Sequence, residues 1–319
     1  MIVVNNMDEF SIIDKYFSGI GFRHSSVSVG SGDDCAVFNV PVDNELCTST
    51  DTLISGVHFP LTCTGDIVAH RSLVANLSDL AAMGAAPVGF LLSLSLPEAT
   101  NSWLSSFANR LSELSELYRI MLVGGNIAKG PLTVTITVLG TVPKGDALLR
   151  SSAQVGEAIF VTGELGMAAA GLKVIEERLK THDYLKSAYL YPSPQLEFAQ
   201  SLRSYASACI DISDGFLADL SHLCDDSNVG AEIETRHIFL NKSLCSYAGS
   251  RALDFALYGG DDYELCFSVP FSSVESVLEL ATIKKTRISQ VGCTTATKGI
   301  SLVKGKTKVP ANIKGYKHF

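Results

Sequence analysis

Segments with the apolar spacing of strands alternate with segments spaced like helices along almost the whole chain. Residues 132–139 alternate strictly, with threonine at every second position, as a half-buried strand does. Residues 103–118 instead repeat large apolar side chains at steps of three and four, which predicts a helix. Such interleaving is typical of proteins in which helices cover the faces of sheets. The sequence therefore predicts an α/β or α+β fold.

The chain is long enough for two such domains. Its 319 residues correspond to about two units of roughly 150 residues, each large enough to bury its own core. The sequence becomes polar between Lys144 and Gly156, and a second series of strands and helices begins at residues 158–161. We therefore expect an N-terminal sheet domain over residues 1–148 and a C-terminal α/β domain over residues 149–319.

The same patterns predict the remaining elements. The expected helices are residues 8–17, 66–83, 167–179, 194–208 and 216–224, and the expected strands are residues 36–40, 46–50, 90–96, 120–123, 208–212, 263–269 and 300–303. The longest uncharged stretch, residues 80–97, contains Gly84, Pro87 and Gly89. It predicts a helix end, a turn and a strand rather than a membrane span.

Composition and charge argue against a nucleic-acid partner, against disulfide bonds and against secretion. Lys and Arg total 25 against 33 Asp and Glu, which gives a net charge of −8 and no basic surface for a nucleic acid. The eight cysteines are scattered without a Cys-x-x-Cys pair, which favours reduced thiols in the core. The N-terminus lacks the charged and apolar segments of a signal peptide. We expect a cytoplasmic protein.

Aspartates recur beside glycine or hydroxyl residues at the edges of apolar segments. They lie in residues 30–34, 49–51, 76–79, 211–215 and 259–264. Converging carboxylates repel each other strongly unless cations lie between them. Because Mg²⁺ prefers oxygen ligands and phosphates commonly complete its coordination, an aspartate set without His or Cys clusters favours Mg²⁺ over zinc. The pattern predicts phosphoryl transfer.

Each aspartate motif also has a structural interpretation. Asp33 and Asp34 follow a Gly-Ser-Gly segment that is typical of a turn. Ser213 or Asp214 would be a suitable N-cap for the helix that follows. Asp79 is harder to explain in this way, because aspartate is unfavourable inside an apolar helix unless it is exposed or bound.

Two further residues have both a functional and an ordinary interpretation. His58 lies beside a glycine turn at an expected strand end, where it is either a ligand-binding residue or a surface or core histidine. Arg150 is either a phosphate-binding fork or a solvated side chain.

Familiar catalytic motifs are missing from the sequence. Residues 299–307 resemble a phosphate-binding loop, but five residues instead of four separate the glycines, and Val309 and Pro310 follow where a helix would begin. The sequence has no G-x-S-x-G elbow, no H-E-x-x-H and no dinucleotide fingerprint. Common hydrolase and dehydrogenase mechanisms are therefore unsupported.

Seven motifs in order resemble the thiamine-monophosphate kinase family, within the aminoimidazole-ribonucleotide-synthetase-like superfamily. They occupy residues 32–36, 49–52 with 58–59, 76–85, 123–125, 212–215, 259–265 and 315–319. Each motif alone is weakly specific, but together they extend nearly from end to end.

The resemblance implies transfer of the ATP γ-phosphoryl group to thiamine monophosphate, with several Mg²⁺ ions, in the last step of thiamine diphosphate synthesis. It also implies a two-domain fold of this superfamily, with ATP and Mg²⁺ in the N-terminal domain, and a homodimer built through the N-terminal domains. We expect direct in-line transfer without a covalent nucleophile, because positioning and charge neutralisation suffice when the acceptor phosphate is already ionised.

The resemblance assigns three groups of site residues. The Mg²⁺ ligands would be Asp34, Ser49, Thr50, Asp51, Asp79, Asn126, Asp211 and Asp214. ATP would contact Gly125, Asn126, Arg150 and Ser213. Thiamine monophosphate would contact His58, Asp261 and Tyr316.

Three positions depart from the family pattern. Asn126 replaces an aspartate and is a weaker Mg²⁺ ligand, Lys129 replaces an arginine and cannot form a bidentate fork, and Asp261 replaces a glutamate and is one methylene shorter.

Two alternatives stay open. A related enzyme with another acceptor, such as a selenophosphate synthetase-like protein, would carry a reactive N-terminal cysteine, whereas Cys35 follows Asp34 as in the kinases. A non-catalytic nucleotide-binding protein would explain Asn126 and Asp261 as decay, although the other carboxylates are retained. The strand over residues 132–139 would fit either a subunit interface or the interior of a sheet.

Overall fold

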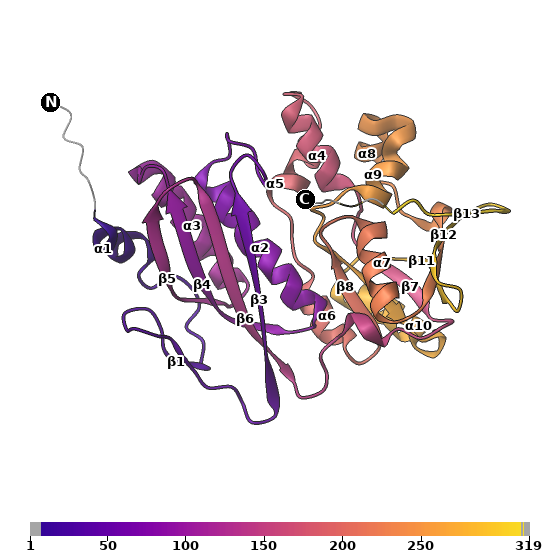
Figure 1. Ribbon diagram of the computed structural model, residues 1–319, viewed down its shortest axis with the longest axis horizontal. Coiled ribbons are helices and arrows are strands. Elements are labelled where there is room, and N and C mark those ends of the chain that lie inside the picture. Colours follow the sequence, from indigo (N-terminus) through magenta and orange to yellow (C-terminus); the bar gives the residue numbers. More distant parts are fainter. Residues whose placement is uncertain (1–7, 314, 316–319) are drawn as a thin grey trace. The chain divides into compact units, whose positions relative to one another are not determined.

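The computed structural model describes residues 8–313 and 315 and divides the chain into two compact units. The first unit contains Met1–Leu80 and Ala86–Lys144, and the second contains Ala81–Ala85 and Gly145–Phe319. Each unit has its own sheet and its own helices (Figure 1). The predicted two-domain mixed α/β fold is therefore confirmed.

A four-stranded sheet forms the centre of the first unit. Its strands, in spatial order, are β3 (Asn44–Ile54), β6 (Thr133–Pro143), β4 (Ala86–Leu96) and β5 (Met121–Lys129). Neighbours are antiparallel except for β4 and β5, which are parallel. The alternating strand predicted over residues 132–139 is β6, and it pairs with β3 and β4 inside this sheet.

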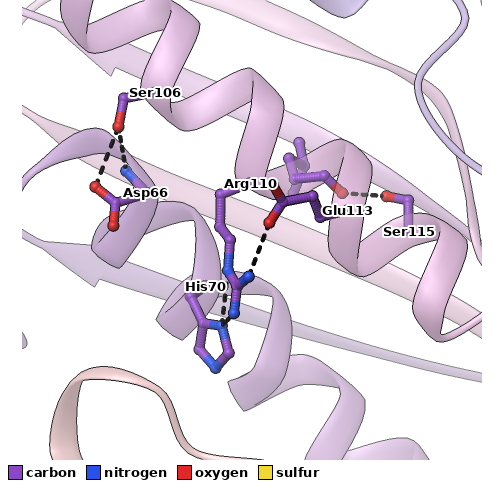
Figure 2. A network of polar contacts seen from close by, with 7 residues as sticks. Asp66, His70, Ser106, Arg110, Glu113 and Ser115 are labelled. Carbon is purple, nitrogen blue, oxygen red and sulfur yellow. Dashed lines mark hydrogen bonds and ion pairs between the residues drawn. The ribbon is translucent and has the colours of Figure 1, made fainter. Parts of the chain in front are cut away.

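Helices α2 (Gly65–Ala82) and α3 (Asn101–Leu117) lie on one face of this sheet (Figure 1). Figure 2 shows two polar contacts that join them. Ser106 Oγ donates to Asp66 Oδ1 at 3.1 Å, and Arg110 Nη2 lies 2.8 Å from His70 Nδ1. Asp66 and His70 are four residues apart in α2, and so are Ser106 and Arg110 in α3. Each pair therefore lies on one face of its helix, and the two contacts join the helices side by side.

The two faces of the sheet differ in polarity. Val134, Ile136 and Val138 of β6 are fully buried, whereas the threonines between them form hydrogen bonds with β3. This difference explains the strict alternation in the sequence, since successive side chains of a strand point to opposite faces.

Shorter elements complete the first unit. Asp8 accepts a hydrogen bond from the Ser11 N–H and caps α1 (Glu9–Ile12), which continues into a π-helical turn (Ile13–Phe17). Strands β1 (Val27–Val29) and β2 (Val37–Phe38) form a separate antiparallel pair.

The second unit contains a seven-stranded sheet. Its spatial order is β13 (Thr307–Pro310), β12 (Gly299–Lys304), β9 (Gly230–Glu234), β11 (Ile288–Thr295), β7 (Ala158–Thr162), β10 (Glu264–Val269) and β8 (Ala208–Ile212). Only the β9 and β12 pair is parallel within this sheet as described. The segment that resembles a phosphate-binding loop is the β12–β13 hairpin, which supports its rejection as a nucleotide site.

The second unit also contains helices. They are α4 (Met167–Glu176), α5 (Asp183–Leu190), α6 (Leu196–Leu202), α7 (Phe216–Asp226), α8 (Lys242–Ala248), α9 (Ala252–Tyr258) and α10 (Val274–Lys284). Phe216, Leu217 and Leu220 of α7 are fully buried in one core cluster with apolar residues of β7 and β8. Helix α6 ends well before the predicted residue 208.

The cysteines are free, and their positions correct one expectation. Cys209, Cys224 and Cys266 are buried, as expected for core thiols, but Cys35 and Cys245 are exposed. Apolar neighbours in sequence do not ensure burial, because a residue in a loop or on an outer helix face can still meet solvent.

None of the helices in the described residues combines the length and apolar character that crossing a membrane requires.

Candidate functional site

The predicted site residues are divided between the two units. The first unit contains Asp34, Ser49, Thr50, Asp51, His58, Asp79, Gly125 and Asn126, and the second contains Arg150, Asp211, Ser213, Asp214 and Asp261. Tyr316 lies outside the described residues.

Helix α2 contacts β3 through polar side chains. Ser49 Oγ donates to Asp79 Oδ2 at 2.5 Å, and the Asp51 N–H donates to Asn76 Oδ1 at 3.1 Å. Asn76 and Asp79 are three residues apart and so share the helix face toward the strand. These contacts explain how α2 tolerates an acidic side chain in an apolar helix, and they bring Ser49, Asp51 and Asp79 together.

Thr50 lies on the other face of β3. Its hydroxyl is 2.9 Å from the Thr137 hydroxyl and also donates to the Ile136 carbonyl at 3.1 Å. Strand alternation therefore separates the Thr50 side chain from those of Ser49 and Asp51.

Asn126 is exposed on β5, in register with Ser93 of β4.

The glycine before Asn126 is required by the close approach of two strands. Gly125 has a φ of +155°, and a Cβ atom placed on it would lie 1.9 Å from the Leu92 carbonyl oxygen. Any side chain at this position would force β5 away from β4 and would displace Asn126.

Asp33 and Asp34 lie in an exposed turn of the first unit. The Asp34 N–H donates to Asp33 Oδ1 at 2.8 Å, and Gly32 has a φ of +115°. Asp33 thus has the role in the turn that its sequence context predicts. The Asp34 side chain is exposed.

His58 follows β3 and is half-buried. Its Nδ1 accepts a hydrogen bond from the Ile54 N–H at 3.0 Å. This bond requires an unprotonated Nδ1, so the neutral ring carries its proton on Nε2. The ring is therefore oriented as a hydrogen-bond donor through Nε2.

In the second unit, the segment before β10 is bonded to the segment after β8. The Asp261 N–H donates to the Ser213 carbonyl at 2.8 Å, and the Tyr263 N–H donates to the Ile212 carbonyl at 2.9 Å. Asp261 and Tyr263 have φ values of +68° and +52°, which are uncommon for residues with a side chain. The Tyr263 hydroxyl donates to Asp261 Oδ1 at 3.2 Å.

Asp219, in the first turn of α7, binds the loop that precedes its own helix. Its Oδ2 accepts the backbone N–H groups of Ser213, Asp214 and Gly215 at 3.0, 3.1 and 3.1 Å. The N-cap of α7 is Gly215, without a side-chain cap. The capping interpretation of Ser213 or Asp214 is therefore wrong. Burial, followed by the nearby Asp214 charge, raises the pKa of Asp219 to about 7, against the lowering effect of the three N–H groups.

Asp262 points into the fold, where it binds the start of α4. Its carboxylate accepts the N–H groups of Gly166 and Ala168 at 2.6 and 3.0 Å. Burial raises the pKa of this carboxyl to about 8. Glu264 accepts a hydrogen bond from the Thr162 hydroxyl at 2.5 Å, and burial raises its pKa to about 7.

Arg150 and Asp211 are related to β8 in different ways. Arg150 is exposed and follows Leu149, which pairs with Ala208 at the start of β8. Asp211 lies near the end of this strand and is only 4% exposed. Arg150 and Ser213 therefore lie at opposite ends of β8.

The donors fit a hard cation in their chemistry. Ser49, Asp51 and Asp79 offer only oxygen atoms, which suits Mg²⁺. Among residues 8–313 and 315, no three His, Cys, Asp or Glu side chains are grouped closely enough to hold a metal ion. The acidic residues of the expected ligand set are divided between the units, with Asp211 and Asp214 in the second.

Sequence reasoning missed several residues that shape these segments. Asn76, Asp219 and Tyr263 bind the backbone or side chains of predicted site residues. Asp219 had a usable signal, since an acidic residue in the first turn of a predicted helix is favourably placed to bind nearby N–H groups. Tyr263 had none, because its contact depends on two unusual backbone angles.

Comparison with known proteins gives matches over both units. The family model described as AIR synthase related protein, N-terminal domain, matches residues 32–142, and the model for the C-terminal domain matches residues 154–305. The thiamine-monophosphate kinase of Escherichia coli (strain K12) is 40% identical over 320 residues, which cover 98% of each chain.

Two solved structures are similar to this chain. The crystal structure of thiamine-monophosphate kinase from Stenotrophomonas maltophilia K279a has a TM-score of 0.84 and 35% identity, and the match covers 87% of this chain and 91% of that one. AaThiL complexed with AMPPCP and TMP has a TM-score of 0.79 and 29% identity, with coverage of 88% and 89%. The similarity thus extends over sequence and fold together.

Proposed function

Because this chain belongs to the thiamine-monophosphate kinase family, we propose that it makes thiamine diphosphate by direct in-line transfer of the ATP γ-phosphoryl group. The chain is an enzyme of this family, an ATP-dependent kinase that phosphorylates thiamine monophosphate. The observation that carries the proposal is the 40% identity to a kinase of this activity over 98% of both chains. The oxygen-only donor group of β3 and α2 supports it.

The proposed Mg²⁺ ligands are Asp34, Ser49, Asp51, Asp79, Asn126, Asp211 and Asp214, without Thr50, whose side chain lies on the other face of β3. Bound Mg²⁺ would reduce the repulsion between the two anionic phosphates. The side chains of Ser49, Asp51 and Asp79 are held on one side of β3. Asn126 contributes a neutral amide in place of the family's carboxylate.

The remaining residues position the two substrates. We assign Gly125, Asn126, Arg150 and Ser213 to ATP, and His58, Asp261 and Tyr316 to thiamine monophosphate. His58 donates through Nε2, because Nδ1 accepts the Ile54 N–H. No side chain forms a covalent intermediate, since the acceptor oxygen is already anionic near neutral pH.

The proposal includes a cytoplasmic homodimer formed through the N-terminal units. The exposed Thr50 and Thr52 side chains lie on the sheet face opposite Val134 and Ile136. That face supports the pairing of two sheets, one from each protomer. Equilibrium sedimentation of the full chain tests this arrangement, and a monomer at micromolar concentration would contradict it.

The test of the function is an assay of the full chain with ATP, Mg²⁺ and thiamine monophosphate. Formation of thiamine diphosphate is expected, and a chiral γ-phosphate should be inverted by in-line transfer. Retention at phosphorus would reject the direct mechanism. Consumption of ATP with only another phosphate acceptor would favour a related synthetase, and nucleotide binding without turnover would favour a non-catalytic protein.

A further inference from the structure

Asp219 is a buried carboxylate that has no assigned contact with either substrate. It is 3% exposed, and one of its oxygens accepts three consecutive N–H groups, those of residues 213–215. Burying a carboxylate is unfavourable unless hydrogen bonds compensate for the loss of water. Three hydrogen bonds from the N–H groups of one loop supply that compensation.

The loop that Asp219 binds through its N–H groups also forms hydrogen bonds through its backbone carbonyls. The Ser213 carbonyl accepts the Asp261 N–H at 2.8 Å, and the preceding Ile212 carbonyl accepts the Tyr263 N–H at 2.9 Å. Gly215 has a φ of +122°, and a Cβ atom there would lie 2.8 Å from the Tyr258 carbonyl oxygen. The path of the backbone at Ser213 and Asp214 is therefore set from both sides.

Stabilisation of the helix start alone is an incomplete explanation. An ordinary cap is an uncharged or acidic side chain at the N-cap position, whereas α7 has glycine there. The acid comes instead from within the helix and bonds the Ser213 and Asp214 N–H groups, which precede the N-cap residue. This arrangement fixes the two residues of the loop that carry functional side chains.

We infer that Asp219 is a positioning residue for the nucleotide side of the reaction, which holds Ser213 and Asp214 where ATP and its metal ion require them. The inference rests on the proposed function, because ATP contact by Ser213 and metal contact by Asp214 are part of that proposal. Asp219 itself touches neither substrate in this role.

The test compares D219N, D219A and the control D226N in the full chain. Asp226 is an exposed acidic residue at the far end of the same helix. The amide oxygen of D219N can still accept the loop N–H groups, although more weakly, whereas D219A removes the acceptor. We expect KM for ATP to rise about tenfold in D219A and about threefold in D219N, with KM for thiamine monophosphate changed less than about twofold.

Thermal unfolding separates positioning from simple stabilisation. If D219N and D219A unfold at lower temperature but keep the wild-type KM for ATP, Asp219 is only a helix-terminal stabiliser and the inference is wrong. If D219A fails to fold, the KM for ATP of D219N alone tests the inference: a raised KM supports it, and a wild-type KM contradicts it. D226N should match the wild-type protein in KM and in unfolding temperature.

Calorimetry with Mg²⁺ and AMPPCP, without an acceptor, distinguishes this inference from the proposed function. If the wild-type protein binds this nucleotide and D219N binds it more weakly, the positioning role of Asp219 is supported even when thiamine monophosphate is not phosphorylated. If the wild-type protein and D219N bind the nucleotide equally well, the inference about Asp219 is wrong even when the kinase activity is present. Absence of nucleotide binding by the wild-type protein would overturn both.

Discussion

The two units hold the side chains of their proposed site residues by different means. In the first unit, Ser49 and Asp51 lie on a strand and Asp79 lies on a helix, so the backbone hydrogen bonds of regular elements set their positions. In the second unit, Ser213, Asp214 and Asp261 lie in loops outside helices and strands. Loop backbone needs other partners, and buried carboxylates supply some of them.

This difference has an electrostatic consequence. Asp219 and Asp262 are 3% and 8% exposed, and burial raises the pKa of both carboxyls, to about 7 and about 8. The aspartates proposed to bind ligands in the second unit, Asp211, Asp214 and Asp261, are thus different from Asp219 and Asp262, which bind backbone N–H groups. A short acidic motif there has divided roles, since Asp261 is half-buried while its neighbour Asp262 points inward.

The largest expected effect comes from removing a carboxylate that the first unit holds on a strand. Asp51→Asn leaves the backbone bond to Asn76 intact, so the fold should be unchanged, whereas the loss of a charged metal ligand should lower kcat/KM about a thousandfold. Steady-state kinetics at several Mg²⁺ concentrations measure this effect. Asp43→Asn, an exposed change in the turn before β3, is the matched control. Activity within tenfold of wild type would remove Asp51 from the metal site.

The loop-holding carboxylates of the second unit should make stability depend on pH. An unfolded Asp262 loses its proton near its ordinary pKa of 3.8, whereas the folded protein retains it up to about pH 8. Stability from this group is therefore highest below about pH 4 and declines between about pH 4 and 8, by at most about 1.4 kcal/mol per pH unit. Glu264 and Asp261 lie nearby and act in the same direction on its pKa.

Urea unfolding of wild-type protein and Asp262→Asn across that pH range checks this expectation. The variant keeps an acceptor oxygen for the Gly166 and Ala168 N–H groups and should show a flatter decline. Equal slopes in both proteins would mean that Asp262 does not retain its proton in the folded state.

A smaller effect is expected where a loop side chain is oriented by a single neutral donor. Tyr263→Phe removes the hydroxyl that donates to Asp261 Oδ1, which should raise KM for thiamine monophosphate about fivefold with little change in kcat. Tyr258→Phe, in the nearby helix α9, serves as the control. An unchanged KM in Tyr263→Phe would show that Asp261 needs no such orientation.

The smallest effect is expected at a position of the first unit that departs from the family. Asn126→Asp restores a carboxylate on exposed β5 and should raise turnover, or lower the Mg²⁺ concentration for half-maximal rate, by about twofold to fivefold. Mg²⁺ titration of the initial rate measures it. No change in either quantity would mean that the amide already suffices.

Much of the fold could be predicted from local patterns. The alternating threonines of β6, the three- and four-residue spacing of α3 and the apolar face of α7 each identified an element correctly. Helix α10, with eleven residues, was not predicted, whereas α5, α8 and α9 were missed because they contain only eight, seven and seven residues. Such short segments give too few repeats of the helical period to stand out.

The sequence by itself determined the mixed α/β architecture, the family and the chemical type of the donors, because periodicity and motif order are properties of the chain. Only the tertiary structure decided which aspartates bind backbone amides, as Asp219 and Asp262 do. Asp261 and Asp262 are neighbours of the same type, yet a positive φ at Asp261 and again at Tyr263 sends their side chains in different directions. Burial and hydrogen-bond partners come from segments distant in sequence, such as Gly166 for Asp262, and no local pattern encodes them.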